Sequence, residues 1–303
     1  MVASFWRSTT SIDYRTRSSA MASDIAGRSY RERYSARMQV TPGQERTMGD
    51  DMRSQLGSVT IIVLMLAASA ANAQEGAEVR QDADGIPFLL DYPDLDDPDG
   101  EVVLENEHVV VQRFIVAPGE WEGIHTHPGN QVYVHVVGGV WSGRAGGEST
   151  YDDSFSEDGS VGWMERIPLS QGHESGNTGD TPIDLIWVTL KGKDPIRPDV
   201  EVERLVYPEI PMELLVDNDR VIVQRVQVEP GQWEGIHSHP GYQVFIHIKG
   251  GTWAGKMGGM LSPTTNTRAD GHVGWMDAID LSEEHESGNV GDTTIDLVWV
   301  TLK

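Results

Sequence analysis

From residue 101 onward, apolar residues fall in short runs that are separated by Gly, Pro, Asn and Asp. Four such runs are VVVQRFIV (109–116), QVYVHVV (131–137), VGWM (161–164) and IDLIWVTL (183–190). Val, Ile, Trp and Tyr dominate them and are typical of β-strands, whereas the residues between them favour tight turns. We find no helical period of useful length. The pattern predicts an all-β protein, with an antiparallel jelly roll as the favoured architecture.

The same runs recur 112 residues later. Residues 101–191 and 213–303 align without a gap and are identical at 51 of 91 positions. A period this long indicates a duplicated domain rather than a solenoid. We therefore predict two tandem jelly-roll β-barrels related by a pseudo-two-fold axis, comprising residues 74–196 and 197–303. The Pro-rich stretch 191–212 reads as the linker between them.

Each repeat is preceded by an acidic, Pro-rich segment. Residues 74–100 contain IPFLLDYPDLDDPDG, and a related string, RLVYPEIPMELL, precedes the second repeat. We expect a short strand near residues 87–91. We also expect the arms 86–98 and 203–211 to lie across the partner repeat and cover its sheet edge. Residues 148–158 and 260–270 differ most between the repeats, and we expect them to form loops at the barrel mouth.

The N-terminal 73 residues differ from everything that follows. Residues 1–51 are rich in Arg, Ser and Thr and are interpreted as an over-extended start or a disordered segment. Residues 52–73, MRSQLGSVTIIVLMLAASAANA, have the positive start, apolar core and Ala-Asn-Ala end of a secretory signal. The apolar run is too short for a spanning helix. We therefore expect a periplasmic or secreted protein with no membrane attachment after signal removal.

Charge and cysteine content narrow the possible partners. The chain has a formal net charge of −24 and no Cys. An acidic surface repels nucleic acid, so no nucleic-acid partner is expected. Without Cys, disulfides and thiolate metal sites are both excluded. The expected substrate is a neutral small molecule or a carbohydrate.

Histidines supply the most specific signal. His125 and His127 lie two residues apart, as do His237 and His239 in the second repeat. Residues i and i+2 of a strand point to the same face, so each pair can ligate one metal ion. A third histidine, His173 or His285, follows in the repeated string HESGN. The intact recurrence of this spacing argues against unrelated core histidines.

These motifs resemble those of the cupin family. The first cupin motif is Gly, five residues, His-x-His, three or four residues, Glu, six residues, Gly. The second is Gly, five residues, Pro-x-Gly, two residues, His, three residues, Asn. The first repeat matches at Gly119, His125, His127, Gln131 and Gly138, and then at Gly162, Pro168, His173 and Asn177. The second matches at Gly231, His237, His239, Gln243 and Gly250, and then at Gly274, His285 and Asn289. Ser170, Asp280 and Ser282 depart from the second motif.

The resemblance implies two similar metal sites per chain, each held by three His and one further ligand. Gln131 and Gln243 stand where the family pattern has Glu, so we expect Gln to be the fourth ligand. Such a ligand set is neutral, which leaves the ion a stronger Lewis acid. Imidazole-rich sites suit Cu, Zn, Fe and Ni, and copper has the highest affinity among them. We therefore favour copper, with Fe, Mn, Zn or Ni possible.

Other repeated residues are candidates for roles around the metal. His135 and His247 fall four residues after the Gln, on the same strand face, with Tyr133 and Phe245 between. We consider His135, His247 and Tyr133 as catalytic candidates, with a hydrogen-bonded interior histidine as the equal alternative. Trp121, Trp233, Trp163 and Trp275 are candidates for the substrate wall, although core packing is the better interpretation of each.

The resemblance implies an oxidoreductase of the dioxygenase or oxidase type, with dioxygen as a possible co-substrate. Quercetin dioxygenase-like cupins use the motif Glu as base, a role that Gln cannot fill but His135 or His247 could. Copper-dependent oxidative cleavage of a polysaccharide is one alternative. A metal-dependent isomerase or lyase, or a sugar- or metal-binding module, is another. The chain is expected to be a monomer of two fused cupins or a higher oligomer.

Overall fold

The computed structural model describes residues 88–145, 148–167 and 172–303, all within one compact unit, Asn72–Lys303. The first repeat contains β1 (Glu101–Glu105), β2 (Val109–Val116), β3 (Gln131–Val137), β4 (Gly139–Ala145), β5 (Glu148–Ser156), β6 (Val161–Met164), β7 (Glu174–Asn177) and β8 (Ile183–Leu190). The second contains β9 (Glu213–Asp217), β10 (Val221–Val228), β11 (Gln243–Lys249), β12 (Gly251–Met257), β13 (Met260–Arg268), β14 (Val273–Met276), the 3-10 helix η3 (Leu281–Glu283), β15 (Glu286–Asn289) and β16 (Ile295–Leu302).

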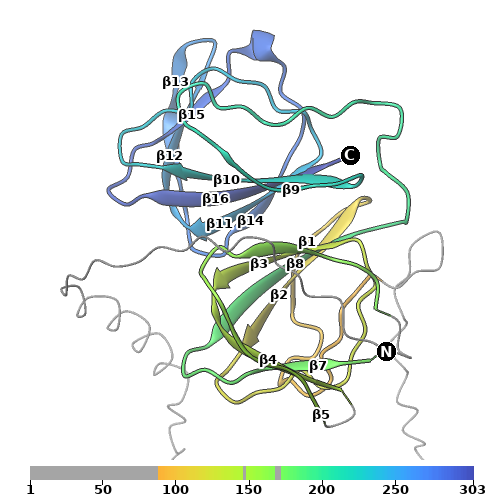
Figure 1. The fold of residues 1–303 in the computed structure, drawn as a ribbon. Helices are drawn as coiled ribbons and strands as arrows, with labels where there is room; N and C mark the ends of the chain where they lie inside the picture. Colours follow the sequence, from red (N-terminus) through yellow and green to blue (C-terminus); the bar gives the residue numbers. More distant parts are fainter. Residues whose placement is uncertain (1–87, 146–147, 168–171) are drawn as a thin grey trace, which may run out of the picture. The chain divides into compact units, whose positions relative to one another are not determined.

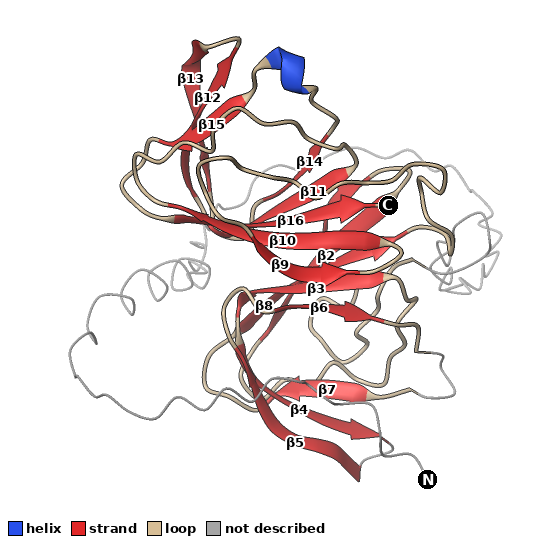
Figure 2. Cartoon of the chain, turned by 45° about the horizontal axis from the view of Figure 1, so that its top comes forward, coloured by secondary structure: helices blue, strands red, loops and turns tan. Residues whose placement is uncertain are grey.

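Each repeat forms one five-stranded and one three-stranded antiparallel sheet (Figure 1). The first repeat has the strand orders β1-β2-β8-β3-β6 and β5-β4-β7. The second has the orders β9-β10-β16-β11-β14 and β13-β12-β15, which repeat the first strand for strand. In both views the three-stranded sheets lie at the sides of the barrels that face away from the other barrel (Figure 2). These paired sheets confirm the all-β class and the two tandem jelly rolls.

The two barrels share a hydrophobic core between their five-stranded sheets. It is built from alternate residues of the central strands, including Val132 and Val134 on β3 and Val244 and Ile246 on β11. β3 lies against β11, β1 against β14, and β6 against β9. Exchanging the repeats leaves this set of contacts unchanged, which is the property of a pseudo-two-fold axis. Because strand residues alternate faces, the other residues of the same strands point into each barrel.

The arms do not lie as expected. Leu90 and Tyr92 are buried in the interior of their own barrel with Phe114 and Trp187. The Leu90 backbone pairs with the Gln112 side chain of β2, donating its N–H at 2.8 Å and accepting at 3.0 Å. Each arm therefore closes its own barrel instead of crossing to the partner repeat, because its apolar side chains fit the open end of that barrel. No strand forms at residues 88–91.

The second arm follows the same plan. Leu205, Tyr207 and Ile210 are buried with Trp299 in the second barrel, and Leu205 pairs with Gln224 of β10. The shared string is Leu-x-Tyr-Pro, at residues 90–93 and 205–208. Its two apolar positions alternate with solvent-facing ones, which is the pattern of an extended segment packed on a core.

The segments that we expected to be loops at the barrel mouth are mostly strands. β5 covers residues 148–156, and β13 covers residues 260–268, each paired with the preceding strand. Pro263 is tolerated because β13 lies at a sheet edge, where a missing N–H costs no ladder bond. The expected leader segments 1–51 and 52–73 and the first part of the arm, 74–87, lie outside the described residues. No helix within the described ranges has the length and apolar character needed to cross a membrane.

Candidate metal centres

A short antiparallel bridge brings the three histidines of each repeat together. His125 N–H donates to the His173 carbonyl at 3.0 Å, and His127 N–H donates to the Ile167 carbonyl at 3.1 Å. The His-x-His segment therefore runs beside the segment that carries the third histidine. One ring nitrogen from each of His125, His127 and His173 lies within 4.8 Å of the others. The second repeat assembles His237, His239 and His285 in the same way.

The two paired histidines direct their Nε2 atoms toward one another. His125 Nε2 and His127 Nε2 are 3.1 Å apart. The opposite nitrogens are both donors: His125 Nδ1 donates to the Gly123 carbonyl at 2.9 Å, and His127 Nδ1 donates to Gln131 Oε1 at 3.0 Å. With the protons on Nδ1, the two Nε2 lone pairs converge, which is unfavourable unless a cation lies between them. The second centre repeats this arrangement, with 3.0 Å between His237 Nε2 and His239 Nε2.

The residues present fit a metal ion. Two nitrogens that each lie about 2.1 Å from one ion are separated by roughly 3–3.4 Å at angles near 90–110°. The Nε2 separations fall in or at the edge of this range. His173 adds a third ring, and its Nδ1 is buried without a hydrogen-bond partner among the described residues. His173 and His285 are partly exposed, whereas the paired histidines are buried, so each centre opens on the side of its third histidine.

Burial keeps these imidazoles neutral. Desolvation lowers the pKa of His125 to about 4 and that of His127 to about 3. The pKa values of His237 and His239 are lowered to about 4 and about 3 for the same reason. A neutral imidazole has the lone pair that a metal ion requires. At neutral pH, all four rings are therefore in the form that binds metal.

Gln131 does not lie among the converging nitrogens. Its Oε1 accepts from His127 Nδ1, on the far side of the ring from Nε2, and its Nε2 donates to Thr189 Oγ1 at 2.8 Å. Gln243 is held in the same way between His239 Nδ1 and Thr301 Oγ1. In this arrangement each Gln orients a histidine and sets its tautomer, and its expected role as the fourth ligand stays a prediction.

A buried carboxylate, which the sequence reasoning missed, lies at each centre instead. Glu122 Oε2 is 3.8 Å from His125 Nε2, and both side chains are almost fully buried. Glu234 stands at the same 3.8 Å from His237 Nε2. Burial raises the pKa of both carboxyls to about 8. The strictly repeated string WEGIH was the available signal, since it places an acidic residue three positions before the first ligand in both copies.

The arm tyrosines complete the walls of the centres. The Tyr92 ring contacts His125 with 4.6 Å between centroids, and its side chain hydrogen bonds with Glu122. Tyr207 makes the same contacts with His237 and Glu234. Trp187 covers the other histidine, with its ring 4.9 Å from that of His127. The arm is therefore part of the site as well as of the core.

The catalytic candidates on β3 lie away from the histidine cluster. His135 is four residues beyond Gln131, about 13 Å along the strand. Its Nε2 accepts from the Trp141 indole N–H at 3.0 Å. Tyr133 lies between, with its ring 5.7 Å from His135 and 5.5 Å from Trp187. His247 similarly accepts from Trp253 at 3.0 Å. These contacts match the alternative interpretation, a hydrogen-bonded interior histidine.

The four tryptophan candidates lie in two other environments. Trp121 packs on Gly176, where an added Cβ would lie 2.3 Å from the indole, and under the Arg144 guanidinium at 3.8 Å. Trp233 packs equally on Gly288 and under Lys256. Trp163 and Trp275 pack against the core between the barrels. The ring-to-ring contacts of the histidine ligands are instead made by Tyr92, Trp187 and their counterparts.

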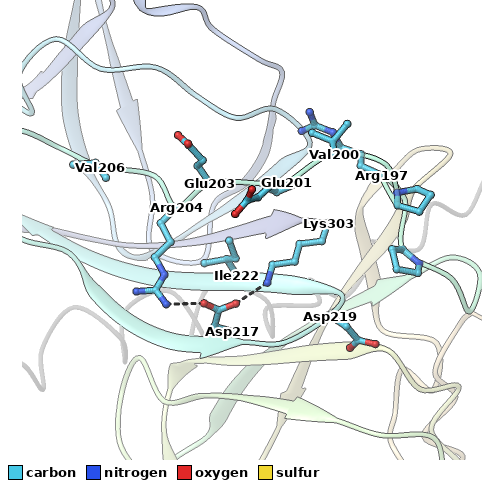
Figure 3. A pocket seen from close by; sticks show the side chains of 13 residues that line it. Arg197, Val200, Glu201, Glu203, Arg204, Val206, Asp217, Asp219, Ile222 and Lys303 are labelled. Carbon is cyan, nitrogen blue, oxygen red and sulfur yellow. Dashed lines mark hydrogen bonds and ion pairs between the residues drawn. The ribbon is translucent and has the colours of Figure 1, made fainter.

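A cavity of about 690 Å³ lies along the linker rather than at the histidines (Figure 3). Two of its cationic side chains pair with the same carboxylate. Asp217 accepts from Arg204 at 2.7 Å and from Lys303 at 2.6 Å. No histidine lines this cavity, so the candidate metal centres are the two histidine triads.

Comparisons with known proteins were made by family, by sequence and by structure. No protein-family model matches the chain. No curated protein matches it by sequence. Similar solved structures include a cupin 2 conserved barrel domain protein from Leptotrichia buccalis, with 12% identity over 66% of this chain and 86% of the other and a TM-score of 0.40.

Two similar structures are enzymes. The oxalate decarboxylase of Lactobacillus farciminis is 11% identical over 65% of this chain and 77% of its own, with a TM-score of 0.44. The salicylate 1,2-dioxygenase of Pseudaminobacter salicylatoxidans is 14% identical over 64% and 71%, with a TM-score of 0.41. The resemblance of the chain to the cupin family is carried by its own motif spacing and by its two jelly-roll barrels.

Proposed function

We propose that this chain is a metal-dependent bicupin that catalyses an oxidation of the dioxygenase or oxidase type. The observation that carries the proposal is the convergence of two deprotonated Nε2 atoms at 3.1 Å, and at 3.0 Å in the second repeat. A third histidine joins each pair. A site of three imidazoles that opens on one side leaves coordination positions for substrate or dioxygen.

Each centre would hold one ion, so the full chain would hold two. When bound, the ion supplies Lewis acidity and, for copper, iron or manganese, redox chemistry. The histidines hold it, and Gln131 and Gln243 keep the ligands His127 and His239 in the Nδ1–H tautomer. Trp187, Tyr92 and their counterparts exclude water from the buried side, which strengthens electrostatic interactions there.

The charge around each triad bears on the choice of metal. The preference for copper rested on a neutral ligand set completed by Gln, and the Gln side chains are turned away from the Nε2 atoms. Glu122 and Glu234 place a carboxylate beside each triad instead. Carboxylate ligands suit manganese, and sites that combine His with a carboxylate also serve iron. We therefore treat iron, manganese and copper as equal candidates.

The proposed substrate is a small neutral molecule or a carbohydrate, taken up with dioxygen after export to the periplasm or the medium. Support for export comes from the signal-like residues 52–73 and the acidic composition. Export with many tryptophans also supports oxidative polysaccharide cleavage as a second candidate. A lyase, an isomerase or a binding module is the non-oxidative alternative.

Metal analysis followed by oxygen consumption tests the proposal. Protein purified from its natural compartment is analysed for metals, then stripped with chelator and reloaded separately with iron, manganese and copper. Dioxygen uptake is followed with phenolic, dicarboxylate and oligosaccharide panels. We expect metal-dependent uptake with one class of substrate. Turnover in the absence of dioxygen would overturn the oxidative reaction, and absence of bound metal would overturn the proposal as a whole.

A further inference from the structure

We infer that Met257 lines the entrance to the second metal centre, which therefore selects substrates that carry an apolar group next to the atoms that bind the metal. The aligned residue of the first repeat is Ala145. The inference rests on the proposed metal-dependent function and deepens it, because it gives the two centres different substrate preferences. Met257 is assigned as a specificity-determining residue, not as a metal ligand.

The pairing of β12 with β15 places Met257 next to the third histidine of the second centre. The two strands are antiparallel, and Lys256 lies opposite Glu286. Continued by one position, this register sets Met257 opposite His285, a member of the triad. Directly opposite residues of an antiparallel pair have Cβ atoms about 4.5–5.5 Å apart and side chains on the same face.

The residues one position back lie on the other face of the same pair. Lys256 Nζ donates to Glu286 Oε2 at 2.8 Å. The same ammonium lies 3.5 Å from the centre of the Trp233 ring. Because successive strand residues alternate faces, Met257 points to the opposite face from Lys256.

That opposite face is the barrel interior. On β12, the Trp253 indole N–H donates to a buried histidine of β11 at 3.0 Å. On β15, Ser287 hydrogen bonds with the buried Glu234. Met257 is four residues from Trp253, and His285 is two residues from Ser287, so all four side chains share the interior face. Met257 therefore points to the same side of the sheet as the ligand His285.

The interior face of β12 has room for a ligand beside Met257. A Cβ added to Gly255, the interior position before Met257, would have the Glu286 carbonyl oxygen as its nearest neighbour, at 4.0 Å. Met257 is 46% exposed, and Met260, its partner across the β12–β13 hairpin, is 76% exposed. Two accessible thioether side chains therefore border an open space on the side where the centre opens, and such side chains adapt to apolar ligands of varied shape.

The first repeat has a different pair of residues at this hairpin. Ala145 and Glu148 pair across β4 and β5 where Met257 and Met260 pair across β12 and β13. The exchange replaces two thioether side chains with a methyl group and a carboxylate. Apolar contact area is lost and a charge is gained, while the histidine triad is the same. An apolar group on the substrate should therefore favour the second centre, and a polar group should favour the first.

Paramagnetic NMR tests the position of Met257 directly. Protein with ¹³C-labelled methionine methyl groups is loaded with Co²⁺, and the Met257 resonance is assigned by its loss in Met257→Leu. We expect this resonance to be shifted or broadened in His125→Ala/His127→Ala, which keeps only the second centre, and unchanged in His237→Ala/His239→Ala. An unaffected Met257 resonance with Co²⁺ bound at the second centre would overturn the inference and leave the proposed function intact.

Ligand binding tests the preference itself. Imidazole and 4-phenylimidazole are titrated into the same two Co²⁺-loaded variants, and each Kd is read from the visible absorption of Co²⁺. The phenyl group should tighten binding at the second centre about fivefold more than at the first, because contact with the thioether removes about 40 Å² of apolar surface from water. Met257→Ala should abolish this difference, and the matched exchange Ala145→Met should create the preference at the first centre.

Two results of this titration would overturn the inference alone. One is an equal preference at both centres, and the other is a preference that survives Met257→Ala. Failure of Co²⁺ to bind at either centre would overturn the proposed function, and this inference with it.

Discussion

The two barrels have the same metal centre in different surroundings. The triad, the Gln behind it, the buried Glu and the arm Tyr are identical in kind and nearly identical in geometry. Behind the centre, Tyr133 in the first barrel is Phe245 in the second. His135 has an unpartnered Nδ1 among the described residues, whereas His247 Nδ1 lies 3.4 Å from the His272 carbonyl. The residues around each histidine triad are the same in both barrels. The differences between the barrels begin with the residues behind them.

The hairpins beside the third histidine differ more. In the second barrel the β12–β13 hairpin turns beside η3, with the Gly258 N–H donating to the Glu283 carbonyl at 3.1 Å. It exposes Met260 and Leu261, with 76% and 60% of their surface accessible. The aligned residues of the first barrel are Glu148 and Ser149. The two centres therefore have the same candidate ligands. The hairpin beside the third histidine is apolar in the second barrel and polar in the first.

Removal of one histidine pair should have the largest effect. His125→Ala/His127→Ala should empty the first centre and leave the second filled, because the triads are built from separate barrels. His237→Ala/His239→Ala should do the reverse. Metal content measured by plasma mass spectrometry should fall from two ions per chain to one in each variant. Loss of both ions from a single variant would show that the barrels do not bind independently.

Truncation of a buried arm residue should destabilise its own barrel. Leu90 and Leu205 are each 1% exposed and each pair with a Gln of the neighbouring strand. Leu90→Ala and Leu205→Ala should each cost about 2–5 kcal/mol of unfolding free energy, measured by denaturant titration. Val206→Ala, at a position that is 65% exposed, is the control. A loss below about 1 kcal/mol for Leu90→Ala would mean that the arm is a loosely held leader.

The metal-free protein should lose stability as the pH rises from about 7.5 to about 8.5. The pKa of Glu122 is raised from 4.5 to about 8, so the folded form holds a proton that the unfolded chain releases. Its contribution is complete below pH 4.5 and disappears as the pH passes 8. The histidines act oppositely: their pKa values are lowered from 6.5, and their contribution is lost as the pH falls toward 4.

Melting temperatures in chelator at about pH 7.5, 8 and 8.5 check this prediction, because from about pH 7.5 upward the histidines are about nine-tenths neutral in the unfolded chain as well as in the folded one. Glu122→Gln and Glu234→Gln should each remove about half of the pH dependence. A melting temperature that rises over the interval would contradict the buried, protonated state of both carboxyls.

Exchange of the ring behind the centre should have the smallest effect. Tyr133→Phe and Phe245→Tyr convert each barrel to the residue of the other, and the aligned neighbours Gly162 and Gly274 leave room for either ring. We expect metal content to be unchanged and stability to shift by less than about 1.5 kcal/mol. A loss of metal-dependent turnover in Tyr133→Phe alone would instead make the hydroxyl a functional group of the first centre.

The sequence by itself determined the periodic architecture and the triads. Strand alternation places His125 and His127 on one face, and the repeated HESGN string supplies the third histidine. The 112-residue duplication predicted two jelly rolls with a two-fold relation, which the strand orders confirm. These features depend on local periodicity and spacing, which can be read directly from the sequence.

Only the tertiary structure shows how Gln131 and Glu122 lie around the histidine triad. Both were within reach of the histidines along the chain, but the rotation of the His127 ring places Nδ1, not Nε2, against Gln131. Glu122 is buried beside Tyr92, a residue of the arm that lies 30 positions earlier in the chain. The sequence also did not predict which barrel the arm packs on, because alternating apolar residues show only that a segment packs against a core. A sequence pattern does not say how a side chain is rotated or which distant segments pack together.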